Sequence, residues 1–187
     1  MLTYITKINK FFVFLFLMMI FNSIYNFASE SNKVSIGMLL GVTFPSLSSG
    51  AFGYGVETHY RILPNLMTGV YYYRYQIGLE ISSDPSSLSS KTSNTFYGAE
   101  SLMDFGGGFG LGLKAGIVKM NSQATATDSV NTVTFDTNRS SFFIGPMMSF
   151  DYPIGHFSAG AQVSYLHTFS DSAPKTLNLL ATGKVNF

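Results

Sequence analysis

Residues 34–44 read VSIGMLLGVTF, and their hydrophobicity alternates with a period of two. One set of alternate positions, from Val34 to Phe44, is apolar throughout. The positions between them hold serine, glycine and threonine, with Leu39 as the exception. Successive side chains of a strand point to opposite faces. The pattern therefore predicts a β-strand with one apolar face and one small or polar face.

Seven further segments alternate in the same way. Each is close to or longer than the ~9–11 residues that a tilted strand needs to cross a bilayer. The alternation is weakest in residues 95–105. Together with residues 34–44 they make eight predicted strands, the other seven being residues 52–62, 67–81, 95–105, 109–120, 141–152, 156–169 and 175–187.

The connections between these segments differ in length in a regular order. Short turns rich in Pro, Asn and Gly lie at residues 63–66, 106–108 and 153–155. The connections between them are polar and mostly longer, at residues 45–51, 82–94, 121–140 and 170–174. Short turns at one end and longer loops at the other predict an all-β fold, an eight-stranded antiparallel transmembrane up-and-down β-barrel. Residues 121–140 also alternate in part, so we expect the flanking strands to continue beyond the membrane as a hairpin.

Composition agrees with a membrane barrel and excludes several other classes of protein. Only 11% of the 187 residues are charged, whereas about a quarter are charged in an ordinary soluble domain. An aromatic content of 16% is unlike that of a disordered chain, and a net charge of +1 lacks the surplus of a nucleic-acid-binding protein. The longest apolar run, residues 11–21, is too short for a membrane-spanning helix. The absence of cysteine excludes disulfides, thiolate catalysis and cysteine-ligated zinc.

The first 28 residues have the order of a secretory signal peptide. Lys7 and Lys10 form a basic segment, residues 11–21 an apolar segment, and residues 22–28 a more polar stretch ending at Ala28. We expect cleavage after Ala28 or, failing that, after the next residue; an uncleaved N-terminal anchor is the alternative. The predicted domains are a signal peptide at residues 1–28 and the barrel at residues 29–187.

The apolar positions are predicted to face lipid and the small or polar positions to face the lumen. Most glycines lie at polar positions, and the interior of an eight-stranded barrel is only wide enough for side chains. In residues 67–81 this rule places Tyr71, Tyr73 and Tyr75 on the lipid side and Arg74 inside. Aromatic residues near the strand ends predict two interfacial girdles, although Tyr73 and Tyr75 lie between them.

The ionisable residues on the predicted lumen face nearly balance in charge. Charges in so narrow an interior must be paired, so we predict a network of ion pairs that plugs the lumen. A general acid–base pair of Glu57 and Glu100 is the alternative. The predicted network consists of Glu57, His59, Arg61, Arg74, Glu80, Glu100, Asp104, Lys114, Asp151 and Lys184.

No metal or cofactor site is predicted. The three histidines do not have the spacing of zinc ligands. The glycines of residues 106–116 lead into a strand, whereas a phosphate-binding glycine loop opens a helix.

The last predicted strand ends in LNLLATGKVNF, residues 177–187. With the eight-segment pattern, it resembles the small eight-stranded outer-membrane β-barrels, the family of the OmpA transmembrane domain, OmpX and the opacity-type surface antigens. The resemblance covers residues 34–187, with departures at Thr182, where glycine is usual, and at Val185, where tyrosine is frequent. It implies a location in the outer membrane of a Gram-negative bacterium, and contact with outer-membrane lipid and lipopolysaccharide. It also implies an assembly signal read by the barrel-assembly machinery, consisting of Leu179, Ala181, Val185 and Phe187.

The expected function is not enzymatic. We expect a monomer with a structural, adhesion or surface-antigen role, carried by the polar residues 82–94 and 121–140. One alternative is a lipid A-modifying enzyme centred on His167, similar to the barrel-shaped lipid A deacylases, although Phe169 stands where their His-x-Ser motif has serine. A narrow pore is the other alternative.

Overall fold

Eight strands account for nearly all of the chain that the computed structural model describes, namely residues 33–46, 50–83, 86–127, 131–170 and 174–187. The strands are β1 (Val34–Pro45), β2 (Ala51–Leu63), β3 (Leu66–Ser83), β4 (Ser86–Asp104), β5 (Phe109–Thr127), β6 (Thr132–Ile154), β7 (Phe157–Thr168) and β8 (Thr176–Asn186). The predicted signal peptide, residues 1–28, lies outside the described residues. Within the described residues there is no helix with the length and hydropathy of a membrane span.

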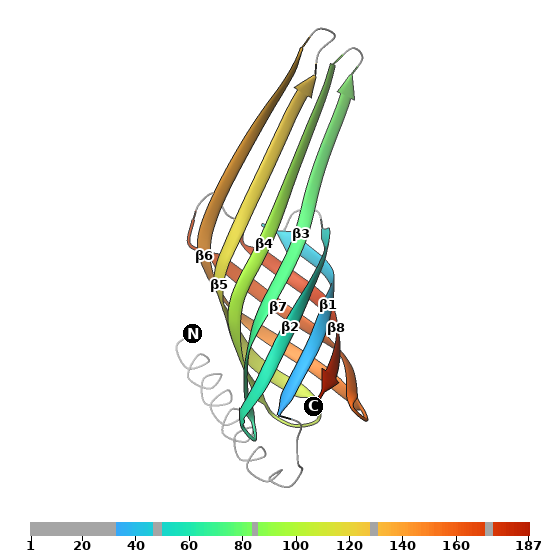
Figure 1. The fold of residues 1–187 in the computed structure, drawn as a ribbon, viewed down its shortest axis with the longest axis vertical. Helices are drawn as coiled ribbons and strands as arrows, with labels where there is room; N and C mark the ends of the chain where they lie inside the picture. The colour runs from blue at the N-terminus through green and yellow to red at the C-terminus, as the bar shows by residue number, and fades with distance from the viewer. Residues whose placement is uncertain (1–32, 47–49, 84–85, 128–130, 171–173) are drawn as a thin grey trace, which may run out of the picture.

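Each strand pairs antiparallel with the next one, and β8 pairs with β1 to close a ring (Figure 1). The closing pairs run from Ser35 opposite Asn186 to Pro45 opposite Thr176. This order confirms the eight-stranded up-and-down barrel. Closure pairs the backbone of every strand on both sides within the ring, so the barrel itself has no free edge.

The alternation in the sequence becomes an alternation of burial around the ring. Leu39 is fully buried inside the barrel, whereas its neighbour Met38 is 61% exposed on the outside. Large apolar side chains are exposed in this way on all eight strands, and they form an outer belt that includes Ile36, Met38, Val56, Val70, Tyr97, Leu113, Ile144, Tyr165 and Leu179.

The orientation predicted for β3 is wrong. Tyr71, Tyr73 and Tyr75 point into the lumen and are at most 5% exposed, so Arg74 lies on the outer side of the strand. The reason is steric. Gly53 on the neighbouring strand β2 has no side chain, and the ring of Tyr73 occupies the space that a Cβ there would need.

The strands β3, β4, β5 and β6 continue far beyond the rim of the barrel (Figure 1). The β2–β3 pairing extends no further than Tyr75, and the β6–β7 pairing begins at Phe143. Beyond these residues the four strands form one sheet, here called the protruding sheet, made of residues 76–83, 86–94, 120–127 and 132–141.

The protruding sheet confirms one prediction about the connections and corrects another. Residues 121–140 contain the expected hairpin extension of β5 and β6. The sequence predicts a loop at residues 82–94, but residues 82–83 belong to β3 and residues 86–94 to β4. Their serine-rich sequence is typical of a loop, yet they pair with β3 on one side and with β5 on the other. Two neighbouring strands supply the backbone partners that keep such a polar segment extended.

The opposite end of the barrel carries tight turns. In the turn between β4 and β5, Gly106, Gly107 and Gly108 all have positive φ angles, of 85°, 64° and 83°. Only glycine adopts this conformation without steric cost. Asp104 supports the turn by accepting a hydrogen bond from the Gly106 amide at 2.8 Å.

Candidate functional site

The lumen contains two groups of side chains, and most members of each group are buried. The lumen charge cluster lies nearer the turn end of the barrel and consists of Glu57, His59, Glu100, Lys114, Asp151, Gln162 and Lys184. The lumen apolar layer lies nearer the rim and includes Leu39, Tyr71, Tyr73, Tyr75, Phe96, Val118, Phe143, Leu166 and Leu180.

Lys184 joins two carboxylates of the lumen charge cluster. Its Nζ lies 3.1 Å from Glu57 Oε1 and 2.8 Å from Asp151 Oδ2. Lys184 is on β8 and Glu57 on β2, so the pair crosses the intervening strand β1. Gly37 of β1 permits this contact, because a Cβ there would lie 2.9 Å from Lys184 Cγ. Glu57 is fully buried, and a carboxylate in that position without its cation would strongly destabilise the fold.

Glu100 is held between two nitrogen groups. His59 Nε2 lies 2.9 Å from Glu100 Oε1, and Lys114 Nζ lies 3.1 Å from Glu100 Oε2. The same ammonium group lies 4.2 Å from the centre of the Tyr71 ring, a cation–π contact. The inward orientation of β3 therefore links the aromatic rings of the lumen to its charges.

Gln162 connects the two halves of the lumen charge cluster, and the sequence prediction missed it. Its Oε1 accepts a hydrogen bond from Lys114 Nζ at 2.7 Å, and its Nε2 donates to Glu57 Oε2 at 3.4 Å. Gln162 is neutral, so the balance of charges on the lumen face gave no indication of it. Its position on the polar face of residues 156–169 was the available signal.

The lumen charge cluster also contains a group of potential metal ligands. The ligand atoms of Glu57, His59 and Glu100 lie within 4.8 Å of one another. Both carboxylates already face a lysine, so a metal ion would have to compete with Lys114 and Lys184 for them. The arrangement therefore favours charge pairing. It equally opposes acid–base work by Glu57 and Glu100, because both are buried and held by ion pairs.

The lumen apolar layer combines ring packing with a short chain of hydrogen bonds. The rings of Phe96 and Phe143 pack edge to face with centroids 5.3 Å apart. The Tyr73 hydroxyl lies 2.6 Å from Thr43 Oγ1, which itself donates to Asn178 Oδ1 at 2.8 Å. Because Thr43 donates to the amide, Tyr73 donates to Thr43. The sequence signal for this layer was the mid-strand position of Tyr73 and Tyr75, which did not suit a girdle.

Four predicted network residues lie outside the lumen charge cluster. Arg61 and Asp104 form their own pair at the turn end, 3.5 Å apart. Arg74 and Glu80 are corrections to the prediction, because both lie on the outer side of β3. Arg74 donates to Ser93 Oγ at 2.9 Å, and Glu80 is exposed on the protruding sheet. The inverted orientation of β3 explains both errors.

The lumen is partly open at the turn end. A cavity of about 310 Å³ lies there, lined in part by Arg61, Asp104, Asp151 and Lys184. Deeper in the lumen, Glu57, Glu100 and Lys114 are buried.

His167 lies near the rim on β7, opposite Ile144 of β6. Its ring packs edge to face against Phe169, with centroids 5.5 Å apart. The position at which the lipid A deacylases have serine is thus filled by an aromatic ring that contacts the histidine.

The outer face of the protruding sheet continues the lipid side of the barrel wall but differs from it in character. Its side chains are polar on all four strands, including Gln76, Glu80, Ser89, Lys91, Ser93, Asn121, Gln123, Thr125, Thr134, Asp136 and Asn138. The change from an apolar to a polar outer surface marks where the wall leaves an apolar surrounding and enters water.

The four residues of the predicted assembly signal lie on the last strand of the ring or directly after it. Leu179, Ala181 and Val185 alternate with buried residues along β8, and Leu179 is exposed. Phe187 follows the strand, is exposed, and exchanges backbone hydrogen bonds with Val34 of β1.

Solved structures with a similar fold are outer-membrane proteins. The crystal structure of Ail, the attachment invasion locus protein of Yersinia pestis, aligns over 85% of this chain and 100% of its own, with 12% identity and a TM-score of 0.54. The structure of Ail in a phospholipid bilayer nanodisc covers 83% of this chain and 99% of its own, at 13% identity and a TM-score of 0.50. A major outer membrane protein from Thermus thermophilus covers 83% of this chain and 98% of its own, at 11% identity and a TM-score of 0.52. At these identities the likeness establishes the fold.

No protein-family model matches the sequence, and no curated protein matches it either.

Proposed function

We propose that the protein is an integral barrel of the outer membrane of a Gram-negative bacterium, with a plugged lumen and a structural, adhesion or surface-antigen role outside the cell. The observation that carries the proposal is a change of polarity along the outer surface of the wall formed by β3 to β6. Its outer surface is apolar within the ring and polar in the protruding sheet. A membrane protein with an external binding surface needs this division.

The apolar belt supports the membrane location. Side chains such as Met38, Val70 and Phe142 are each more than 60% exposed on the outer wall. In water, a continuous apolar belt of this kind would drive aggregation. In a bilayer the same side chains contact lipid, the lipopolysaccharide of the outer leaflet included.

The contents of the lumen favour a plug over a pore. The lumen charge cluster crosses the interior from Lys184 through Glu57 and Gln162 to Lys114. The lumen apolar layer lies between that cluster and the rim. An ion passing through would have to break buried ion pairs and then cross a layer of packed rings.

Three further parts of the proposal concern biogenesis and partners. Export would use the signal peptide at residues 1–28, and the barrel-assembly machinery would recognise Leu179, Ala181, Val185 and Phe187. The protein would act as a monomer and not as an enzyme. A role in attachment gains support from the fold shared with Ail, which is described as an attachment invasion locus protein.

Labelling of single cysteines on whole cells tests the location and the topology together. The chain has no cysteine, so Ser87→Cys and Thr127→Cys each introduce one thiol, near the tips of the protruding sheet. Asn65→Cys is the matched control in a turn at the other end. A membrane-impermeant maleimide should label the first two variants on intact cells and the third only after lysis. Labelling of Asn65→Cys on intact cells would contradict the topology.

Two measurements test the alternatives. Planar-bilayer recordings of the refolded protein should give a flat trace, and discrete conductance steps would establish the pore instead. Lipid A incubated with the refolded protein should keep its mass. If the unaltered protein removes an acyl chain and the His167→Ala variant does not, the protein is an enzyme.

A further inference from the structure

The inner face of the protruding sheet, which continues the lumen side of the barrel wall, has four rows of side chains in register. The row at the rim is Tyr75, Asn94, Met120 and Arg139. The next row outward is Ile77, Thr92, Ser122 and Thr137, and the third is Leu79, Ser90, Ala124 and Phe135. The row nearest the tips is Ile81, Leu88, Ala126 and Val133. The two rows nearer the rim thus hold the charged, amide and most of the hydroxyl side chains, and the two rows nearer the tips are almost entirely apolar.

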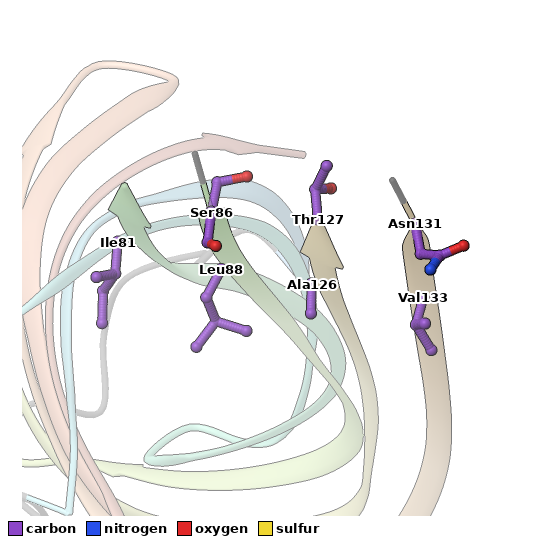
Figure 2. Close-up of a pocket in the computed structure, with 8 residues that line it drawn as sticks. Ile81, Ser86, Leu88, Ala126, Thr127, Asn131 and Val133 are labelled. Carbon is purple, nitrogen blue, oxygen red and sulfur yellow. The ribbon is translucent and has the colours of Figure 1, made fainter. Parts of the chain in front are cut away.

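The apolar part of this face is uncovered. Leu79, Ile81, Leu88, Val133 and Phe135 are all at least 43% exposed. Ile81, Leu88, Ala126 and Val133 line a shallow hollow of about 430 Å³, shown in Figure 2. Because the other face of the same four strands is polar, the apolar side chains are segregated on one surface. Such segregation on an exposed sheet marks a binding surface.

The end of the face at the rim is suited to an anion. Arg139 carries the only charge in the four rows, and within the described part of the chain no carboxylate lies within 4.0 Å of its guanidinium. On the far side of Met120 in the same row, Asn94 is 1% exposed. Neither its amide nitrogen nor its amide oxygen has a hydrogen-bond partner among the described residues. Thr92 and Ser122 add a pair of hydroxyl groups 3.1 Å apart in the next row.

We propose that this inner face binds a single-chain anionic amphiphile of the fatty-acid type. The carboxylate lies at Arg139 and the hydroxyl row, and the acyl chain runs outward over Leu79 and Phe135 into the hollow at Leu88 and Val133. The ligand class follows from charge and from area. The two apolar rows cover on the order of 300 Å², whereas a stable protein interface needs about 800 Å² from each partner.

The direction of the polarity gradient identifies the source of the ligand. The acyl chain points away from the barrel and its carboxylate toward it. A lipid in the leaflet around the barrel has the opposite orientation, with its head group outward and its chains in the membrane. The amphiphile therefore comes from the surrounding medium. The inference rests on the proposed function only in placing the protruding sheet outside the membrane.

Paramagnetic labelling in lipid nanodiscs tests both binding and orientation. The refolded protein is titrated with stearate that carries a nitroxide near its methyl end, and separately with stearate that carries it near its carboxylate. The first probe should broaden the amide resonances of Leu88, Ala126 and Val133, and the second those of Thr137 and Arg139. Both effects should saturate and be reversed by unlabelled stearate. Equal broadening of all rows by both probes, or broadening only of barrel residues, would overturn the proposal.

Neighbouring residues on opposite faces provide matched variants. Leu88→Glu places a charge in the hollow and should abolish the broadening, whereas Ser89→Glu places the same charge on the polar face and should leave it unchanged. Arg139→Gln should weaken binding by about fivefold to tenfold, and Lys91→Gln should have no effect. The slower gel migration of each variant after boiling checks that its barrel is folded.

Three results would reject the assignment. Equal loss in Leu88→Glu and Ser89→Glu would show that the hollow is not the site. Unaltered affinity in Arg139→Gln would remove the carboxylate subsite. Shifts of the tip resonances with protein concentration and without probe would identify a second copy as the occupant. These readouts use isolated protein, so they are independent of the whole-cell labelling that tests the cellular location.

Discussion

The Tyr73 hydroxyl occupies the space that a side chain at Gly53 would need on the neighbouring strand. This relationship determines which face of β3 points into the lumen. The ring of Tyr73 fits inside the barrel because residue 53 on the neighbouring strand is a glycine. Gly55 on the same strand also lies close to β3, where a Cβ would overlap the Tyr72 carbonyl oxygen and lie 3.1 Å from the Tyr73 ring.

Gly53→Ala should therefore destabilise the barrel. The added methyl group overlaps the Tyr73 hydroxyl and displaces it from Thr43, so we expect a loss of about 1–3 kcal/mol in the free energy of unfolding. Gly78→Ala is the matched control, because a Cβ there meets nothing closer than the Ser90 carbonyl oxygen at 4.0 Å. The measurement is urea unfolding of the refolded protein in lipid vesicles. Equal unfolding midpoints for the two variants would contradict the packing described for Tyr73.

Lys114→Met should be more damaging than any exposed substitution. It leaves Glu100 buried with His59 as its remaining ion-pair partner among the described residues. Removal of one partner from a buried pair costs about 3–5 kcal/mol. Arg74→Met removes a cation from the outer side of β3, where the guanidinium donates to the Ser93 hydroxyl, and we expect about 1 kcal/mol or less. The same unfolding assay compares the two variants. A larger loss of stability in Arg74→Met than in Lys114→Met would mean that Arg74 faces the lumen, as the sequence alone predicts.

The double variant Glu100→Gln with Lys114→Met should be less destabilised than the sum of its single variants. The buried carboxylate that loses its lysine in Lys114→Met is then absent, so the two changes are coupled by about 0.5–3 kcal/mol. A double-mutant cycle on unfolding free energies measures this coupling. Additive effects would mean that the 3.1 Å contact between Lys114 and Glu100 contributes little to stability.

The barrel could be predicted from the sequence, but the contents of its lumen could not. A period of two fixes which side chains share a face, so seven strands could be oriented from the apolar set alone. On β3 both sets are bulky, with tyrosines on one side and Tyr72 and Arg74 on the other. The choice between them depended on glycines in β2 and β4, which become neighbours only when the strands pair. Tyrosine is also amphipathic, so it suits a membrane interface and a polar lumen equally well.

The β4 part of the protruding sheet, residues 86–94, escaped prediction for a different reason. Residues 86–94 are mostly serine, threonine and asparagine, and such residues favour turns when they are considered alone. Their extended structure depends on β3 and β5, which lie on either side of them. The inner-face hollow at Leu88 could not be found either, because its lining comes from four segments that are separate in the sequence.

Hydrogen exchange should resolve the edges of the protruding sheet from its centre. Residues 76–83 of β3 and 132–141 of β6 have a strand partner on one side only within the described chain, whereas residues 87–94 of β4 and 120–127 of β5 are paired on both sides. Alternate amides along the two edges therefore face outward without a backbone acceptor, and free amides exchange fastest.

We expect every second amide of residues 76–83 and 132–141 to exchange at least tenfold faster than the amides of β4 and β5 at the same height above the rim. Residues 69–75 of β3, which pair with both β2 and β4, serve as the internal control because they lie on the same strand. Uniform slow exchange along the whole of β3 would mean that its outer edge is covered, and that the four strands are not the free-standing sheet described above.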